Sequence, residues 1–302
     1  MINSIEQIIN FRYKKSHLYA DTYYFSKLPL QEIERILLQQ PGVFTNFKLS
    51  ILPDKKIYFN PDCATNDVFC TTKRIHKLEK IIDTYNFSFD NLVCAGDDEL
   101  LSDNIKYLKN VRHLFDKNIY YEAKDVECKW VTTIPMGMIM FYMLRCGPDT
   151  ILHHINKTQN KTKLMGSAFG SKWPELNFTI TDRILLNKFT QNSKFVDDIF
   201  CDPSDYFERL SDCKFFACPL GNGIQTPKIC ESILCETVPV VTNHIAHREL
   251  RDIYDLPLLI VDKWEDLTEE LLNETYENKF KRIDWQKEKS KFLVENFKNL
   301  LI

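Results

Sequence analysis

A glycine turn, a lysine and a glutamate follow one another at short spacing in this chain. Gly221, Asn222 and Gly223 interrupt an apolar run, and Lys228 and Glu231 come next in a stretch with helical spacing. A flexible turn that leads into a helix N-terminus presents backbone N–H groups and a positive dipole end, which favour an anion such as phosphate. The lysine adds positive charge, and the carboxylate could accept hydrogen bonds from vicinal hydroxyls such as those of a ribose. Together these groups indicate a nucleoside diphosphate site.

The same spacing has a simpler interpretation. Lys228 and Glu231 stand three residues apart, so they could form a solvated ion pair on an ordinary strand–helix–strand crossover. A glycine turn before a helix is a weak signal by itself. The residues alone fit the two interpretations equally well.

The elements around the turn follow from the local pattern. Residues 215–218 are apolar and predict a strand over 214–218, and residues 238–242 predict a second buried strand. Between them, Thr226 is suited to be an N-cap and Pro227 to be the first helical residue. The apolar face of this helix consists of Ile229, Cys230, Ile233 and Leu234.

This segment resembles the C-terminal signature of exostosin-like glycosyltransferases and, more loosely, of the GT-B class. The residues that match the family pattern at its spacing are Pro219, Gly221, Asn222, Gly223, Thr226, Lys228, Glu231, Leu234, Pro239, Val240 and Val241. A weaker similarity continues through residues 256–264, and upstream through residues 163–170 and Arg183. The chain departs from the pattern where Leu220 replaces an arginine, Gln225 an aspartate and Lys228 an arginine. Lysine keeps the charge but loses the bidentate fork.

The resemblance implies a fold and a reaction. The fold is α/β and GT-B-like, with two Rossmann-like domains facing a cleft and a C-terminal helix that crosses back to the first domain. The reaction moves a sugar from a UDP-sugar donor to a hydroxyl of an oligosaccharide acceptor, with inversion and with no required divalent metal. The donor site that the resemblance implies comprises Gly221, Asn222, Gly223, Thr226, Lys228, Glu231, Arg183 and His244. The last of these belongs to residues 243–248, expected as a loop beside the donor.

An inverting transfer also needs a general base near the acceptor hydroxyl. Asp97 and Asp98 directly follow the predicted strand 91–95, and Asp62 follows the predicted strand 57–59. Ligands of open α/β sheets bind beyond the carboxyl ends of the strands, so these three acids are the candidates for the base.

Two other functions fit parts of the sequence. Asp97 and Glu99 could hold Mn²⁺ against a nucleoside diphosphate, as in a metal-dependent GT-A transferase. The replacements at Leu220 and Gln225 would instead suit a non-catalytic protein that binds a glycan or a nucleotide on the same fold.

Composition narrows the class of protein. The chain has 302 residues, 44% of them hydrophobic, and a formal net charge of −3, typical of a globular protein that does not bind nucleic acid. No apolar run approaches 18 residues and no secretory signal is evident, so we expect a cytoplasmic protein without a membrane span. The ten cysteines form no C-x-x-C pair and are expected to be buried free thiols.

Alternating strand and helix patterns predict three parts. Residues 1–130 are expected to form an acceptor-binding Rossmann-like domain, residues 131–280 a nucleotide-sugar-binding one, and residues 281–302 a terminal helix packing toward the first domain. Helices are expected over 73–85 and 103–108. Further strands are predicted at residues 46–52, 119–121, 130–134, 162–167, 178–180 and 258–261.

Overall fold

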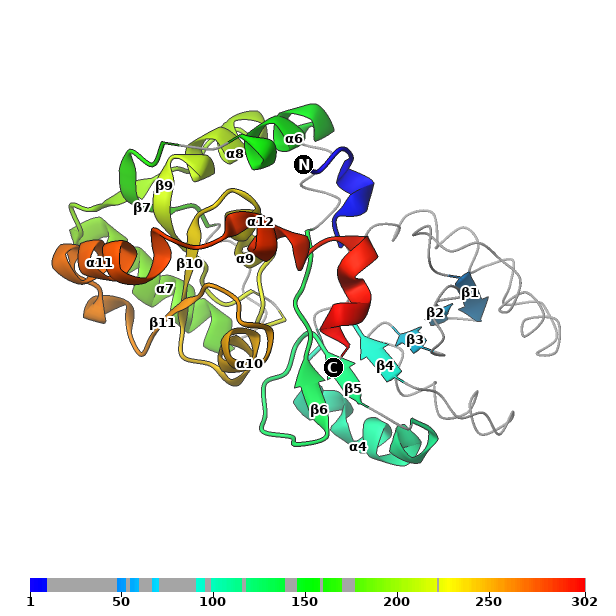
Figure 1. Cartoon of the computed structure of the whole chain (residues 1–302). Helices are drawn as coiled ribbons and strands as arrows, with labels where there is room; N and C mark the ends of the chain where they lie inside the picture. Colours follow the sequence, from blue (N-terminus) through cyan, green and yellow to red (C-terminus); the bar gives the residue numbers. More distant parts are fainter. Residues whose placement is uncertain are drawn as a thin grey trace. The chain divides into compact units, whose positions relative to one another are not determined.

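The computed structural model of this chain forms two compact units (Figure 1). Unit 1 comprises Met1–Asn10 and Pro135–Leu300, and unit 2 comprises Phe11–Ile134 and Leu301–Ile302. The expected domain boundary lay at residue 130, and the units divide after Ile134. The structure describes residues 1–9, 48–52, 55–59, 67–70, 91–95, 99–115, 118–138, 146–157, 160–169, 177–221 and 223–301.

Unit 2 contains a sheet whose strands are neighbours in the order of the sequence. The first three strands pair antiparallel and the last four pair parallel. These strands are β1 (Lys48–Leu52), β2 (Lys55–Phe59), β3 (Asp67–Cys70), β4 (Asn91–Cys94), β5 (Ile119–Tyr121) and β6 (Val131–Thr133). The expected parallel sheet is therefore present and is extended by an antiparallel hairpin.

A single described helix covers the core of unit 2. Helix α4 (Leu101–Val111) buries Leu101, Leu108 and Val111, and a short 3-10 turn, η3 (Arg112–Leu114), follows it. This spacing of three and seven residues places the apolar side chains on one face of the helix. They pack with Leu92, Ile119 and Val131 of the sheet.

Unit 1 is a doubly wound sheet of five parallel strands. Its strands are β7 (Lys163–Ser167), β8 (Val196–Asp198), β9 (Cys213–Ala217), β10 (Val238–Thr242) and β11 (Leu259–Val261), and their order is β11-β10-β9-β7-β8. The second strand in sequence lies on one side of the first, and the third lies on the other side. The strand order thus reverses between β7 and β9, and this reversal is the topological switch point of the sheet.

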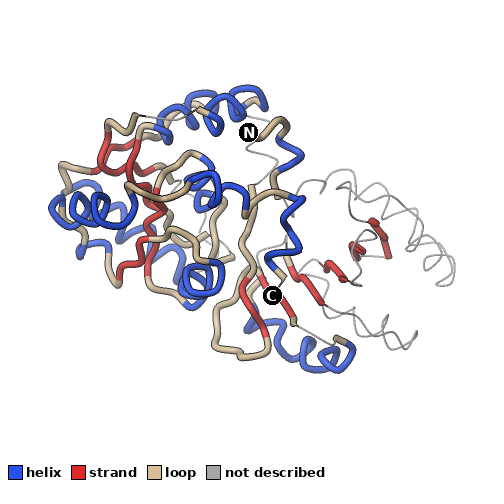
Figure 2. Tube along the Cα trace, in the orientation of Figure 1, coloured by secondary structure: helices blue, strands red, loops and turns tan. Residues whose placement is uncertain are grey.

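Helices cover both faces of this sheet (Figure 2). Side chains alternate between the two faces along each strand, so Phe215 and Phe216 of β9 point in opposite directions. Phe215 packs in a core with Leu186 of α7 (Asn177–Asn192) and Leu272 of α11 (Glu269–Thr275). Phe216 contacts Tyr206 of α8 (Pro203–Ser211) on the opposite face. The helices of this unit are α6 (Pro148–Asn156), α7 (Asn177–Asn192), α8 (Pro203–Ser211), α9 (Lys228–Leu234), α10 (Ile245–Tyr254), α11 (Glu269–Thr275) and α12 (Trp285–Ser290).

The two chain ends contribute to unit 1. The N-terminal residues, with η1 (Ile5–Gln7), bond to α6 through Ile2, whose N–H and C=O pair with the side chain of Asn156 at 2.9 and 2.6 Å. Near the C-terminus, α12 contacts α9, after η4 (Trp264–Asp266) and η5 (Tyr276–Phe280) and before η6 (Val294–Leu300). The terminal segment up to Leu300 thus belongs to unit 1, and its expected crossing to the N-terminal domain stays a prediction.

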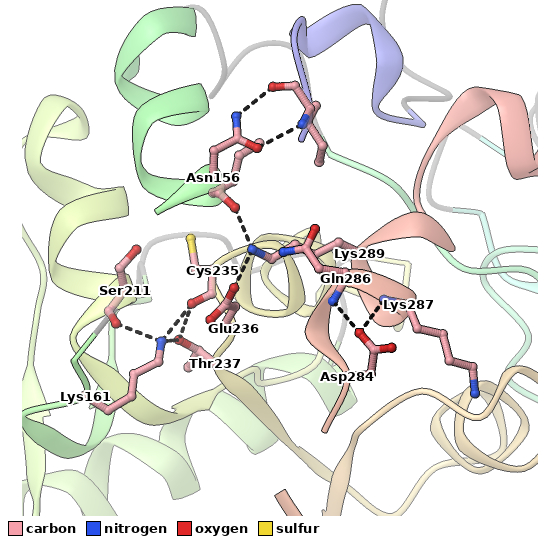
Figure 3. A network of polar contacts seen from close by, with 12 residues as sticks. Asn156, Lys161, Ser211, Cys235, Glu236, Thr237, Asp284, Gln286, Lys287 and Lys289 are labelled. Carbon is pink, nitrogen blue, oxygen red and sulfur yellow. Dashed lines mark hydrogen bonds and ion pairs between the residues drawn. The ribbon is translucent and has the colours of Figure 1, made fainter. Parts of the chain in front are cut away.

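Two lysines, the half-buried Lys161 and the buried Lys289, fix the carboxyl ends of three helices (Figure 3). Lys161 Nζ donates to the carbonyl oxygens of Ser211 and Cys235, each at 2.7 Å, and to Thr237 Oγ1 at 3.0 Å. Lys289 Nζ donates to Ile155 O at 2.6 Å and pairs with Glu236 at 2.7 Å. Cations are favourable at helix C-termini. The end of α9 distant from the glycine turn is therefore firmly anchored.

One expected strand is a helix. Residues 178–180 were predicted to be extended because they are aromatic and β-branched, but they lie inside α7. Tertiary context decides here, since α7 buries Asp182, Leu186 and Phe189 at helical spacing.

The expected helix over 73–85 lies outside the described residues. Eight cysteines are free thiols, and all of them are buried except the half-buried Cys201: Cys94, Cys128, Cys146, Cys201, Cys213, Cys218, Cys230 and Cys235. In the described part of the chain, no helix combines the length and the apolar character needed to cross a membrane.

Candidate functional site

The glycine turn lies at the switch point of unit 1. Strand β9 ends at Ala217, and the chain continues through Cys218, whose N–H donates to Val240 O at 2.8 Å, to Leu220 and Gly221. Strand β7, the parallel neighbour of β9, ends at Ser167. In doubly wound sheets, ligands bind in the crevice outside the carboxyl ends of the strands at such a reversal. Strand order thus points to the same place as the glycine pattern.

The turn is tight and needs glycine at its first position. Gly221 and Ile224 exchange two backbone hydrogen bonds, of 3.1 and 3.3 Å, and Gln225 N–H donates to Gly223 O at 2.8 Å. A Cβ at Gly221 would lie 2.5 Å from the backbone oxygen of Gln225, too close for any other residue. Ile224 has a φ of 71°, which is rare for a β-branched residue and often marks a functional site. Within the described part of the chain, the N–H of Gly223 makes no hydrogen bond.

Two consecutive residues of α7 hold the backbone just before the turn. Asp182 Oδ2 accepts the N–H of Leu220 at 2.8 Å, and Arg183 Nε donates to the C=O of the same residue at 3.2 Å. The sequence predicted Arg183 as a partner of the diphosphate. The structure places it beside the turn, with Nε bonded to the protein backbone.

The carboxylate of Asp182 also joins two further strand ends. Its Oδ1 accepts the indole N–H of Trp264 at 2.8 Å, and Thr242, the last residue of β10, donates to it as well. Burial raises the pKa of Asp182, while these hydrogen bonds and Arg183 oppose the rise. Sequence analysis missed Asp182, because no local pattern connects it to residues so distant along the chain.

The residues just after the turn have structural partners. Gln225, which stands where the family pattern has an aspartate, accepts the N–H of Met136 through Oε1 at 2.9 Å. Helix α9 begins at Lys228 with Pro227 as its N-cap residue, one position later than expected. Thr226 Oγ1 accepts only a long hydrogen bond, of 3.5 Å, from the N–H of Lys228.

Lys228 and Glu231 meet around a tyrosine that the sequence gave no reason to select. Glu231 is only 2% exposed, and its Oε2 accepts the hydroxyl of Tyr206 at 2.9 Å. The ammonium of Lys228 lies 3.5 Å from that hydroxyl, and 4.9 and 5.5 Å from the ring centroids of Tyr206 and Phe216. Burial raises the pKa of Glu231 and lowers that of Lys228, and each charge opposes the shift of the other. Lys228 and Glu231 are therefore linked through the Tyr206 hydroxyl, and they do not form the solvated pair of an exposed helix face.

The expected loop at residues 243–248 is mostly helix. Helix α10 begins at Ile245, and His244 is its N-cap, with Nδ1 accepting the N–H of Ala246 at 3.3 Å. The expectation of a loop beside the donor is therefore wrong for residues 245–248.

His247 is a buried histidine in that helix. Its Nδ1 lies 2.7 Å from Thr242 O, and because a carbonyl can only accept, Nδ1 carries the proton. Burial lowers the pKa of His247 to about 4, so the ring is neutral near pH 7. Its Nε2 is buried, with no hydrogen-bond partner in the described part of the chain.

The expected acceptor-side residues lie mainly outside the described residues. This holds for Asp62, Asp97 and Asp98, and also for Asn222 of the turn. Glu99 is described, and its Oε2 accepts the side-chain amide of Asn104 at 3.3 Å. The described residues include no cluster of three or more potential metal ligands, and Asp97 is not among them. Glu122, which the sequence analysis did not select, directly follows β5 and is completely buried.

Comparison with known proteins adds no family to this geometry. No protein-family model matches the chain, and a search of curated proteins gives no significant match. The strand order, the turn and the side chains around it are therefore the grounds for assigning a function.

Proposed function

We propose that this chain is a glycosyltransferase that transfers a sugar from a UDP-sugar to a hydroxyl of a glycan. The observation that supports this most is the glycine turn at the switch point of a doubly wound sheet, followed directly by Lys228 and Glu231. The similarity of these residues to the exostosin-like signature supports the choice of donor and a GT-B architecture. Because α9 has only seven residues, the proposal rests on the turn and the side chains and not on a helix dipole.

In this proposal the turn and two cations bind the diphosphate. None of the described residues accepts the N–H of Gly223, and a glycine backbone lets a phosphate approach closely. Lys228 and Arg183 offset the negative charge that develops on the departing UDP. Stabilising charge that develops in the transition state raises turnover and not only affinity.

The chemistry at the sugar is a displacement. The acceptor oxygen bonds to the anomeric carbon while the bond from that carbon to the diphosphate oxygen breaks, and UDP leaves with the electron pair. A carboxylate accepts the proton of the acceptor hydroxyl, and Asp97, Asp98 and Asp62 are the candidates. We propose that the reaction inverts the anomeric centre and requires no divalent metal.

Glu231 is proposed to bind the ribose. The Tyr206 hydroxyl occupies Oε2, so the ribose hydroxyls would donate to Oε1. Tyr206 then orients the carboxylate, and the charge of Lys228 opposes the rise that burial causes in the pKa of Glu231. A carboxylate already held by a hydrogen bond loses little freedom when the nucleoside binds.

Titration calorimetry with UDP tests the proposal. We expect wild-type protein to bind UDP and Glu231→Gln to bind it at least about tenfold more weakly, since hydrogen bonds to charged groups contribute roughly 1.5–3 kcal/mol. Glu236→Gln is the matched control, because it removes a carboxylate at the opposite end of α9. Absence of UDP binding by the wild-type protein would rule out the proposal, and slow hydrolysis in a panel of UDP-sugars would identify the donor.

A second candidate is a non-catalytic protein that binds a nucleotide or glycan at the same turn. Two observations favour it: Gln225 bonds to Met136 N–H, and Arg183 Nε bonds to the backbone of Leu220. UDP-sugar binding without hydrolysis, and without transfer to any member of an acceptor panel, would select this candidate.

A further inference from the structure

One buried carboxylate connects three strand ends at the switch point. Asp182 is 7% exposed and accepts hydrogen bonds from Leu220 after β9, from Thr242 at the end of β10 and from Trp264 after β11. Leu220 N donates to Oδ2 and Trp264 Nε1 donates to Oδ1, each at 2.8 Å. Charge-assisted bonds of this length are among the stronger ones in proteins.

Only an acceptor with two oxygens satisfies this arrangement. The partners at Leu220 and Trp264 are both N–H groups, which can only donate. An asparagine would direct its own NH₂ group at one of them, and an alanine would leave both without an acceptor. A buried donor without a partner is costly, so the carboxylate is specifically required at this position.

The glycine turn is fixed on both of its sides. Before the turn, Asp182 and Arg183 bond to the N–H and the C=O of the same residue, Leu220. After the turn, the side chain of Gln225 bonds to Met136. The turn between these anchors contains the left-handed Ile224, a conformation that persists only where the surroundings impose it.

We infer that Asp182 is a positioning residue, which holds the turn at Gly221–Gly223 in the geometry that binds the diphosphate. This inference rests on the proposed function for the identity of the ligand, but its structural part does not depend on it. Asp182 itself makes no contact with substrate in this account. It acts through the backbone of Leu220, and its other oxygen accepts the indole N–H of Trp264.

The test compares Asp182→Ala with Trp264→Phe. Both variants remove the bond between Asp182 and the indole, but only Asp182→Ala also removes the acceptor of Leu220 N–H. Amide hydrogen exchange over residues 218–225 and calorimetry with UDP are measured on the full chain. If Asp182→Ala does not fold, Asp182→Asn takes its place, because it keeps the shape of the side chain and one acceptor.

We expect Asp182→Ala to accelerate exchange in the turn and to weaken UDP binding, each by at least about tenfold, the factor that follows from one lost charge-assisted bond. Trp264→Phe should leave both measurements within about threefold of wild type, since Leu220 keeps its acceptor. A general loss of stability would instead change exchange and UDP affinity by similar factors in both variants, and it would accelerate exchange throughout unit 1.

Three other outcomes are decisive. Unchanged exchange in the turn of Asp182→Ala would overturn the inference. Faster exchange with unchanged UDP affinity would overturn it too, since the geometry of the turn would then not control binding. If the wild-type protein does not bind UDP, the proposed function fails, and the exchange data alone decide whether Asp182 positions the turn.

Discussion

The two units are both layered α/β structures, but their strand orders differ. In unit 2 the parallel strands β3 to β6 are neighbours in sequence order, whereas in unit 1 the order reverses between β7 and β9. At a reversal, successive crossovers leave the sheet toward opposite faces, and a crevice remains between the two loops. Strand order alone therefore locates a candidate binding edge in unit 1, and it does not do so among the described strands of unit 2.

Buried polar side chains serve different purposes in the two units. In unit 2, Lys124 donates to the carbonyl oxygens of Cys128 and Val131, at 3.1 and 2.6 Å, and so closes the turn before β6. In unit 1, Asp182 bonds to the backbone next to a strained glycine turn. Lys124 supplies hydrogen-bond donors to the carbonyl groups of its own loop. Asp182 instead holds a turn that we propose binds a ligand. Substitutions in the two units should therefore separate loss of stability from loss of binding.

The largest effect is expected at Gly221. A Cβ in Gly221→Ala would lie 2.5 Å from the backbone oxygen of Gln225, so the turn must change shape and UDP binding should be lost. Gly147→Ala is the control, because Gly147 also has a positive φ, of 84°, but its Cβ would meet only ordinary contacts. We expect the control to lose about 1 kcal/mol of stability while it retains UDP affinity. Equal UDP affinities for the two variants would contradict the proposal that UDP binds at the glycine turn of the switch point.

Acid should destabilise unit 1 through His247. The pKa of His247 is about 4 in the folded protein against 6.5 for the free side chain, so between these values the unfolded chain binds a proton that the folded protein does not. The free energy of unfolding should therefore fall as the pH decreases from 6.5 to 4, by about 3 kcal/mol in total. His247→Asn should show a flatter dependence in chemical unfolding over this range. An unchanged slope would show that His247 does not stay neutral when buried.

A substitution in unit 2 should affect stability without affecting binding. Lys124→Met removes the donor to Cys128 O and Val131 O and should cost about 2 kcal/mol, since two buried acceptors lose a charged partner. Denaturant unfolding measures this loss, and calorimetry should show UDP affinity equal to that of the wild-type protein. Weaker UDP binding by this variant would mean that the two units are not functionally separate in the way proposed.

The smallest effect is expected at Tyr206. Tyr206→Phe removes one hydrogen bond to Glu231 and leaves the aromatic contacts with Lys228 and Phe216 in place. One such bond contributes about 1–2 kcal/mol, so UDP affinity should fall roughly fivefold to thirtyfold. Tyr107→Phe, at a half-buried tyrosine of α4 in unit 2, is the control. No change in Tyr206→Phe would mean that Glu231 needs no orienting partner.

Parts of this arrangement were predictable from the sequence because they depend on local pattern. Strands β5 and β10 lie at the residues that the apolar runs predict, and the glycine turn between two strands follows from the breakers at 221–223. The strand predicted at 178–180 was wrong, since its local propensity favours extension but the apolar face of α7 continues well beyond it.

The partners of the turn could not be predicted, because they come from distant parts of the chain. Asp182 and Trp264 are 82 residues apart, and Gln225 and Met136 are 89 residues apart. Tyr206 lies in a helix two elements before α9, with nothing in its surroundings to distinguish it from a core tyrosine. Such contacts are set by the strand order, and a single sequence does not reveal the reversal between β7 and β9.

The central claim is that the switch point of unit 1 binds a nucleoside diphosphate. The most direct measurement is amide hydrogen exchange of the wild-type chain with and without saturating UDP. The account predicts slower exchange at residues 218–231 and in the first half of α7, with unit 2 unchanged. Absence of protection at the glycine turn, or protection confined to unit 2, would contradict it.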